Sequence, residues 1–200
     1  MNKARIAVLV SGGGTNLQAL IDAQHCGIIQ SGEIALVISN NATAFALERA
    51  AKANIATAVV LKKECGSQAA FEEKVKSLIS ENRIDLIVLA GFMSILSENF
   101  TKDYPERILI VHPSFIPSFC GVGYYGLRVH EEALAYGVKV TGATVHFVNE
   151  IPDGGKIVLQ KAVDIEEGDT PEVLQKRVME QAEWKILPAA VELVSKQLVG

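Results

Sequence analysis

The stretch "RIAVLVSGGGTNLQALIDA", residues 5–23, joins a strand, a glycine loop and a helix. Residues 5–10 are almost entirely apolar, which is typical of a strand buried on both faces. From Thr15 onward the apolar residues have helical spacing and lie on one face. A buried strand that passes through glycines into an amphipathic helix is the repeating unit of a parallel α/β sheet.

The same alternation continues along the first half of the chain. Further strands are predicted at 33–39, 57–61, 84–91 and 107–112, and helices at 43–53 and 67–82. Ser67 is the expected N-cap of the second of these helices. We therefore predict an α/β fold with an open, doubly wound, mostly parallel and Rossmann-like sheet.

The pattern changes beyond a short helix predicted at 128–137. Two strand-like runs, 141–150 and 156–165, flank "IPDGG", in which Asp-Gly is a turn signal. They predict an antiparallel C-terminal hairpin. The long terminal helix has three marked positions, namely an N-cap at Thr170, Pro171 in its first turn and a kink at Pro188.

The composition is that of an ordinary globular protein, with 200 residues, 49% hydrophobic and 21% charged. The net charge of −4 argues against nucleic acid as a partner. The longest apolar run, from Leu86, is too short to span a bilayer, so we expect no membrane segment. The three cysteines, Cys26, Cys65 and Cys120, are widely spaced and odd in number. They are expected to be reduced, which favours a cytoplasmic location.

The glycine loop "SGGGTNLQ" lies between a strand and a helix, where free N–H groups favour an anion. A dinucleotide loop has the pattern G-x-G-x-x-G and an acidic residue after the second strand. Here Leu17 replaces the third glycine, and "SNN" ends the second strand. We therefore favour a phosphate monoester over a dinucleotide, bound against residues 12–16. A nicotinamide-dependent oxidoreductase is correspondingly disfavoured.

A second motif combines His112, at the end of the strand "ILIVH", with Asp153 in "IPDGG". A histidine moves protons near pH 7, and a carboxylate can orient it and raise its pKa. Alone, each residue has a simpler explanation, as a core histidine or a turn former. What favours the pair is topology, because open α/β sheets bind ligands at the carboxyl ends of their strands. The four histidines have no metal-ligand spacing, so no metal is expected.

Four segments, "SGGGTNLQALID", "VLAGFMSILS", "VHPSFIPSFCG" and "VHFVNEIPDGGKIVLQKAV", resemble the glycinamide ribonucleotide formyltransferases, folate-dependent enzymes of purine synthesis. The resemblance extends over essentially the whole chain. It implies one formyltransferase domain over 1–200, with a phosphate-binding half, 1–105, and a catalytic and folate-binding half, 106–200. Related families, such as the methionyl-tRNA formyltransferases, carry extra domains for which this chain has no room.

The resemblance also implies a reaction. The amine of N1-(5-phosphoribosyl)glycinamide attacks the formyl carbon of 10-formyltetrahydrofolate, the co-substrate. A tetrahedral oxyanion forms and collapses as the folate nitrogen is protonated, with His112 and Asp153 as the catalytic pair. The partners implied are small molecules only, for a monomer or a homodimer. The substrate-binding residues implied are Gly12, Gly13, Gly14, Thr15, Asn16 and Glu183. The folate-binding residues implied are Met93, Ser94, Ile95, Leu96, Asn149, Glu150, Ile151, Pro152 and Asp153.

One departure from the family pattern affects the chemistry. The family has Asn-x-His-Pro-Ser, whose asparagine donates to the formyl oxygen, whereas this chain has Ile110 at that position. Two smaller departures are Gln68 and Ser94, where relatives often have arginine near the folate tail. Two functions stay open on these grounds: an active formyltransferase, and a ligand-binding homologue with weakened catalysis.

Overall fold

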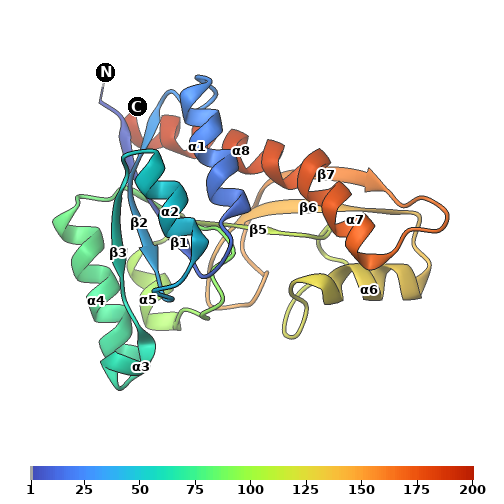
Figure 1. Cartoon of the computed structure of the whole chain (residues 1–200), viewed down its shortest axis with the longest axis horizontal. Helices are drawn as coiled ribbons and strands as arrows, with labels where there is room; N and C mark the ends of the chain where they lie inside the picture. The colour runs from blue at the N-terminus through green and yellow to red at the C-terminus, as the bar shows by residue number, and fades with distance from the viewer. Residues whose placement is uncertain (1) are drawn as a thin grey trace.

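A computed structural model describes residues 2–200 and contains one seven-stranded sheet (Figure 1). The strand order is β3-β2-β1-β4-β5-β6-β7. The strands are β1 (Ala4–Val10), β2 (Gly32–Ser39), β3 (Ala56–Val59), β4 (Leu86–Leu89), β5 (Ile108–His112), β6 (Val140–Phe147) and β7 (Ile157–Asp164). The first five pair in parallel, whereas β5 with β6 and β6 with β7 are antiparallel. The predicted fold class is confirmed.

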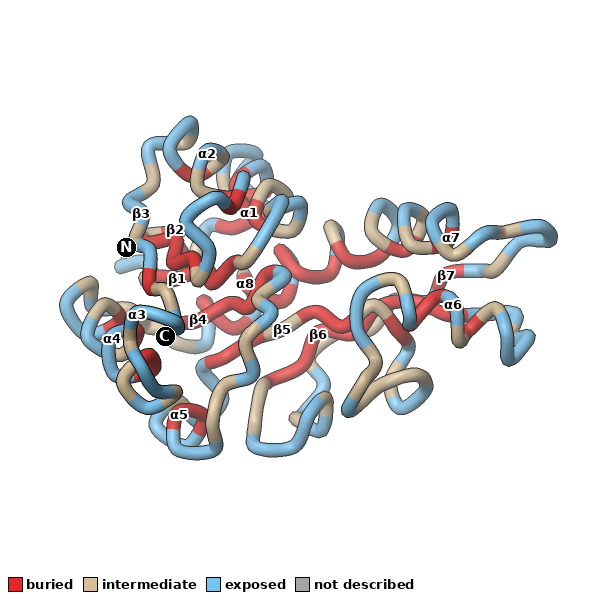
Figure 2. The backbone as a smooth tube through the Cα atoms, turned by 60° about the horizontal axis from the view of Figure 1, so that its bottom comes forward, coloured by how far each residue is buried: buried red, intermediate tan, exposed pale blue. Residues whose placement is uncertain are grey.

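Helices cover both faces of the sheet and enclose two hydrophobic clusters. The helices are α1 (Thr15–His25), α2 (Phe45–Lys52), α3 (Lys62–Cys65), α4 (Gln68–Glu81), α5 (Glu98–Asp103), α6 (Leu127–Tyr136), α7 (Pro171–Val178) and α8 (Trp184–Val199). One cluster joins α1, α2, α7 and α8 to the sheet, and the other joins α4 and α5 to its opposite face. Figure 2 shows the central strands buried along almost their whole length. Their uniform apolarity in the sequence follows from this cover on both faces.

The C-terminal hairpin is present, but its connection is longer than the Asp-Gly signal indicated. β6 ends at Phe147 and β7 begins at Ile157, so that residues 148–156 form a loop and not the ends of two strands. Asp153 lies in this loop with a left-handed backbone, at φ 55°. Aspartate tolerates this conformation better than most residues, because its short side chain bonds locally. The turn signal thus marks the loop that carries a candidate catalytic residue.

The terminal helix begins as predicted, since the Thr170 side chain accepts from the N–H of Val173 and Pro171 follows it. Pro188 lies inside α8, and a further irregularity precedes that helix. It is a π-helical turn, η1 (Met179–Glu183), between α7 and α8. Such turns are rare and occur often at functional sites. Within residues 2–200, no helix has the length and apolarity needed to cross a membrane.

Candidate functional site

The candidate site lies at the carboxyl ends of three adjacent strands, β1, β4 and β5. The glycine loop follows β1, residues 90–97 follow β4, and His112 ends β5. Hydrogen bonds join residues 90–97 to the loops after β1 and β2: the N–H of Met93 donates to Ser11 Oγ (2.8 Å), and Asn40 Nδ2, just beyond β2, donates to Ser94 Oγ (2.8 Å). The parallel sheet therefore brings together segments that are 82 and 54 positions apart in sequence.

The glycine loop presents free backbone donors. Within residues 2–200, the N–H groups of residues 12–16 have no hydrogen-bond acceptor. Gly14 has φ 71°, and a Cβ built there would lie 2.6 Å from the Cβ of Ala46, so both backbone and space demand glycine. Gly12 and Gly13 are exposed. The loop and the start of α1 can thus hold an anion.

Asn16 connects this loop to the terminal helix. Its Nδ2 donates to Glu183 Oε2 over 2.9 Å, although the two residues are 167 positions apart. Glu183 is only 6% exposed and is the last residue of the π-helical turn. Burial raises the pKa of the Glu183 carboxyl, and the Asn16 bond partly opposes that shift. The two substrate-binding candidates therefore meet.

The structure also brings His112 and Asp153 together. His112 Nδ1 lies 3.6 Å from Asp153 Oδ2, and the His112 ring is almost completely buried. The opposite ring nitrogen, Nε2, is 2.9 Å from the carbonyl oxygen of Phe119. Asp153 Oδ2 also accepts from the N–H of Gly121, at 2.7 Å. A doubly protonated imidazole ring would have an acceptor at each nitrogen in this arrangement.

A second histidine contacts Asp153, and no motif in the sequence indicated its role. His146 Nε2 lies 3.5 Å from Asp153 Oδ1, and its Nδ1 is 2.8 Å from the Phe147 carbonyl oxygen. Burial would raise the pKa of Asp153, but the contact with His146, the charge of His112 and the Gly121 N–H together lower it. The available signal was a lone histidine inside the otherwise apolar strand "TVHFV".

Ile110 points to the same side of the sheet as His112. Ile108 and Ile110 pack in the cluster under α4 and α5, whereas Leu109 and Val111 pack in the other cluster, as strand alternation requires. Ile110 is half-buried and lies opposite His146 in the β5–β6 ladder. An isoleucine at this place fills space but has no hydrogen-bond donor to offer.

The two segments implied for folate lie on either side of β5, after β4 and after β6. Three of their apolar side chains are strongly exposed: Met93 at 65%, Ile95 at 83% and Ile151 at 58%. Leu96 and Asn149 are half-buried, and Glu150 and Pro152 are exposed. Gln68 Nε2 donates to the Ile95 carbonyl (3.1 Å), so this side chain joins the first segment to α4.

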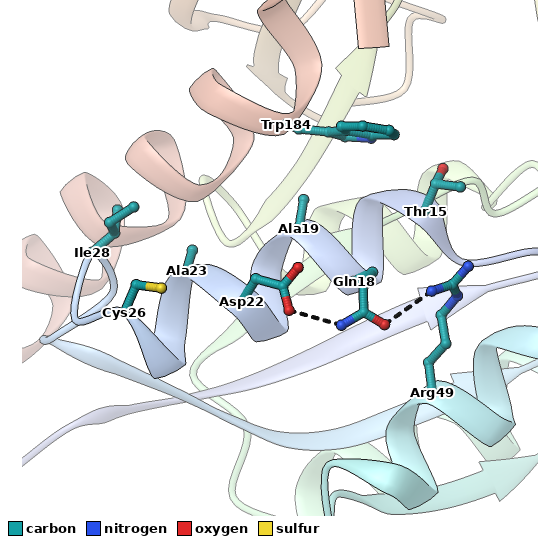
Figure 3. Close-up of a pocket in the computed structure, with 9 residues that line it drawn as sticks. All are labelled: Thr15, Gln18, Ala19, Asp22, Ala23, Cys26, Ile28, Arg49 and Trp184. Carbon is teal, nitrogen blue, oxygen red and sulfur yellow. Dashed lines mark hydrogen bonds between the residues drawn. The ribbon is translucent and has the colours of Figure 1, made fainter. Parts of the chain in front are cut away.

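A groove of about 360 Å³ extends from the start of α1 along the outer face of that helix (Figure 3). Its walls are Thr15, Gln18, Ala19, Asp22, Ala23, Cys26, Ile28, Arg49 and Trp184. Trp184, which follows the π-helical turn, faces α1 across the groove. The groove meets the glycine loop at Thr15 but contains neither His112 nor Asp153. Within residues 2–200, no group of three or more His, Cys, Asp or Glu side chains could hold a metal ion.

Comparison with known proteins assigns the class. The formyl transferase family model matches residues 4–191. The chain therefore belongs to the formyl transferase family.

Three similar proteins narrow the comparison. Phosphoribosylglycinamide formyltransferase of Haemophilus influenzae is 44% identical over 94% of this chain and 85% of that protein. The trifunctional purine biosynthetic protein adenosine-3 of Bos taurus is 45% identical over 98% of this chain, which spans only 19% of that longer protein. The crystal structure of glycinamide ribonucleotide transformylase 1 from Symbiobacterium toebii superposes with a TM-score of 0.90, at 40% identity, over 98% of this chain and 89% of that one.

Proposed function

We propose that this protein transfers a formyl group from 10-formyltetrahydrofolate to the amine of N1-(5-phosphoribosyl)glycinamide in purine synthesis. The observation that carries the proposal is the His112–Asp153 pair beside a phosphate-type glycine loop, in a fold shared with phosphoribosylglycinamide formyltransferases. Nothing in the comparisons favours the alternative of a ligand-binding homologue with weakened catalysis. A single formyltransferase domain over 1–200 is part of the proposal, and the one continuous sheet supports it.

On the substrate side, the N–H groups of residues 12–16 bind the phosphate, helped by the side chains of Thr15 and Asn16. Glu183 contacts the glycinamide end of the same molecule. Support comes from the Asn16–Glu183 hydrogen bond, which holds the acid beside the loop. The raised pKa of Glu183 also suits a buried group that acts as a hydrogen-bond partner without a strong net charge.

On the catalytic side, Asp153 orients His112, which stabilises negative charge on the formyl oxygen and supplies a proton to the departing amine. The lowered pKa of Asp153 supports this role, because it keeps the carboxylate charged under mildly acidic conditions. His146 orients the second oxygen of Asp153. The carbonyl of Phe119 has to leave His112 Nε2 before that nitrogen can face a substrate.

The folate co-substrate lies against residues 93–96 and 149–153. Exposed apolar side chains in both segments, namely Met93, Ile95 and Ile151, fit a flat aromatic ring system. The protein supplies shape and orientation there, and the formyl group itself comes from the co-substrate. A cytoplasmic location is also proposed, since none of the three cysteines is in a disulfide. The oligomeric state, a monomer or a homodimer, stays a prediction that analytical ultracentrifugation can test.

A steady-state assay with both substrates tests the function. Formylated glycinamide ribonucleotide should accumulate in step with tetrahydrofolate, and His112→Ala should remove most of the rate. Protein with an intact thermal transition but no transfer from any formyl-folate would contradict the proposal. NAD should show no saturable binding in the same preparation, because the third glycine and the acidic residue of a dinucleotide site are both missing.

A further inference from the structure

The carbonyl groups of the glycine loop are all engaged, and they face α2 and α1. The Gly12 carbonyl accepts from the backbone N–H of Ala46 at 3.0 Å. The Gly13 carbonyl accepts from Nε of Arg49 at 2.8 Å. The Gly14 carbonyl accepts from the N–H of residue 18 at 2.9 Å, which is the first bond of α1.

This engagement determines where the N–H groups point. In a trans peptide the N–H is directed opposite to the carbonyl of the same unit. The bond from Ala46 therefore turns the Gly13 N–H away from α2. The bond from Arg49 does the same for the Gly14 N–H. Both donors are left free on the open side of the loop, next to the N–H groups of the first turn of α1, where they converge on an anion.

Arg49 differs from the other contacts of the three glycine carbonyls because its bond comes from a side chain. The bond from Ala46 and the first helical bond are both backbone contacts, which no substitution removes directly. Among residues 2–200, Arg49 is the only side chain that donates to a carbonyl of residues 12–14. The direction of the Gly13–Gly14 peptide thus depends on one guanidinium group.

The guanidinium is itself held from three sides. Its Nη1 donates to Gln18 Oε1 over 3.0 Å, and Gln18 Nε2 donates to Asp22 Oδ1 over 2.8 Å. Figure 3 shows this chain of bonds on one side of α1. The guanidinium carbon also lies 5.0 Å from the centre of the Phe45 ring, within cation–π distance. An arginine restrained in this way loses little further freedom when it holds the loop.

We propose that Arg49 is a positioning residue for the phosphate of the phosphoribosyl substrate. It fixes the Gly13–Gly14 peptide so that the Gly14 N–H faces the phosphate, beside the Gly13 N–H that the bond from Ala46 directs. It contacts the loop from behind and not the reacting atoms. The inference rests on the proposed function, because it assumes that the loop binds a phosphate monoester.

A matched control distinguishes the effect of the Arg49 contact with the loop from the effect of its positive charge. Lys52 is on the same helix, and its Nζ lies 5.8 Å from the same Phe45 ring, but it makes no bond to the loop. Lys52→Met therefore removes one positive charge from α2 and leaves the loop contact in place. Arg49→Lys keeps the charge but loses the planar fork that bonds Gly13 and Gln18 together. Arg49→Met removes both.

The experiment measures kinetics and phosphate binding on the four proteins. Arg49→Lys and Arg49→Met should raise KM for the phosphoribosyl substrate about tenfold or more, because a charge-assisted hydrogen bond is lost. KM for 10-formyltetrahydrofolate should stay unchanged. The thermal stabilisation of the ligand-free protein by inorganic phosphate should weaken in parallel. Lys52→Met should behave as the parent protein in all three measurements.

Two results would overturn the inference. One is an Arg49→Lys protein that equals the parent while Arg49→Met and Lys52→Met are both impaired, since charge alone would then explain the effect. The other is unchanged phosphate stabilisation in every variant. If Arg49→Met does not fold, Gln18→Met, which removes the support of the guanidinium, should give a smaller effect of the same kind. The phosphate titration does not depend on the reaction, so it tests Arg49 even if the protein transfers no formyl group. Normal formyl transfer together with unaffected Arg49 variants would contradict the role of Arg49 and leave the proposed function standing.

Discussion

The glycine loop and the His112–Asp153 pair lie at the same edge of the sheet but are built in opposite ways. The loop is local: one strand, three glycines and the first turn of one helix, all within residues 4–25. The groups that it offers to a phosphate are backbone N–H groups, which do not titrate. The pair joins the end of β5 to the loop after β6, and His146 and Gly121 complete it. Its histidine and aspartate side chains are titratable and are buried or half-buried.

The difference teaches that the two parts respond to different changes. A backbone site is sensitive to anything that alters φ or fills the space behind a glycine. A buried side-chain cluster is sensitive to charge, because each partner balances the desolvation of the others. Substitutions and pH should therefore separate the two halves of the site.

The largest effect is expected for Asp153→Asn. The change leaves shape almost unaltered but removes the charge facing His112 and His146, so kcat should fall about 100- to 10,000-fold. The KM for the phosphoribosyl substrate should change little. Because the pKa of Asp153 is lowered, the parent protein should keep its rate down to the ordinary aspartate range, and lose it as pH falls through the lowered value.

Asp164→Asn is the control, because Asp164 ends β7 in the same hairpin and is exposed. Stopped-flow or steady-state rates with melting curves on both variants make the comparison. If Asp153→Asn were as active as Asp164→Asn, the charge of the pair would have no role in the reaction.

The next effect concerns acid stability and His130, which is fully buried on α6. Burial and the nearby charge of His112 lower its pKa to about 4. In the unfolded chain the pKa is near 6.5. Between these values the unfolded state binds more protons, so stability falls as pH decreases, by about 3 kcal/mol in total at pH 4.

His130→Leu should remove this part of the acid sensitivity. Unfolding in urea at pH 7 and at pH 4.5 gives the free energies, with the exposed His25→Gln as the control. The pH dependence should become shallower in His130→Leu only. If the unfolding free energy of His130→Leu depended on pH as steeply as that of the parent protein, His130 would not be the cause of the lost stability in acid.

Gly14→Ala tests the glycine loop, the part of the site that is built from backbone groups. The methyl group would meet Ala46 at 2.6 Å and would have to adopt φ 71°. We expect about 1–3 kcal/mol of lost stability and at least a tenfold higher KM for the phosphoribosyl substrate. Gly27→Ala isolates the cost of φ, because Gly27 has φ 73° with nothing within 4 Å. Equal unfolding energies for the two variants would mean that the contact with Ala46 is easily relieved.

The smallest expected effect is a gain of catalytic activity. Ile110→Asn places a donor on the face shared with His112, where it can bond the developing oxyanion. One such donor is typically worth about 100- to 1,000-fold in rate, but Asn in a half-buried strand costs some stability, so we expect kcat/KM to rise about tenfold or more. Ile110→Val controls for the change in volume. Equal, high activity in all three proteins would show that another group already serves the oxyanion.

The sequence alone determined the alternation of strands and helices, since periodicity and apolarity are properties of neighbouring residues. It also identified Gly14, whose role follows from a local turn, and the Thr170 cap. It located the Asp-Gly turn but not the nine-residue loop around it, because strand ends depend on pairing with β5. It did not indicate the π-helical turn at residues 179–183, since helix interruptions respond to packing on the sheet as well as to proline.

Only the tertiary structure placed His146 on Asp153, Asn16 on Glu183 and Arg49 behind the glycine loop. These contacts join residues 7, 167 and 36 positions apart, which lie on different elements. No local pattern encodes such distances. They arise because burying both faces of the sheet fixes the strand order, and the strand order brings distant loops to one edge.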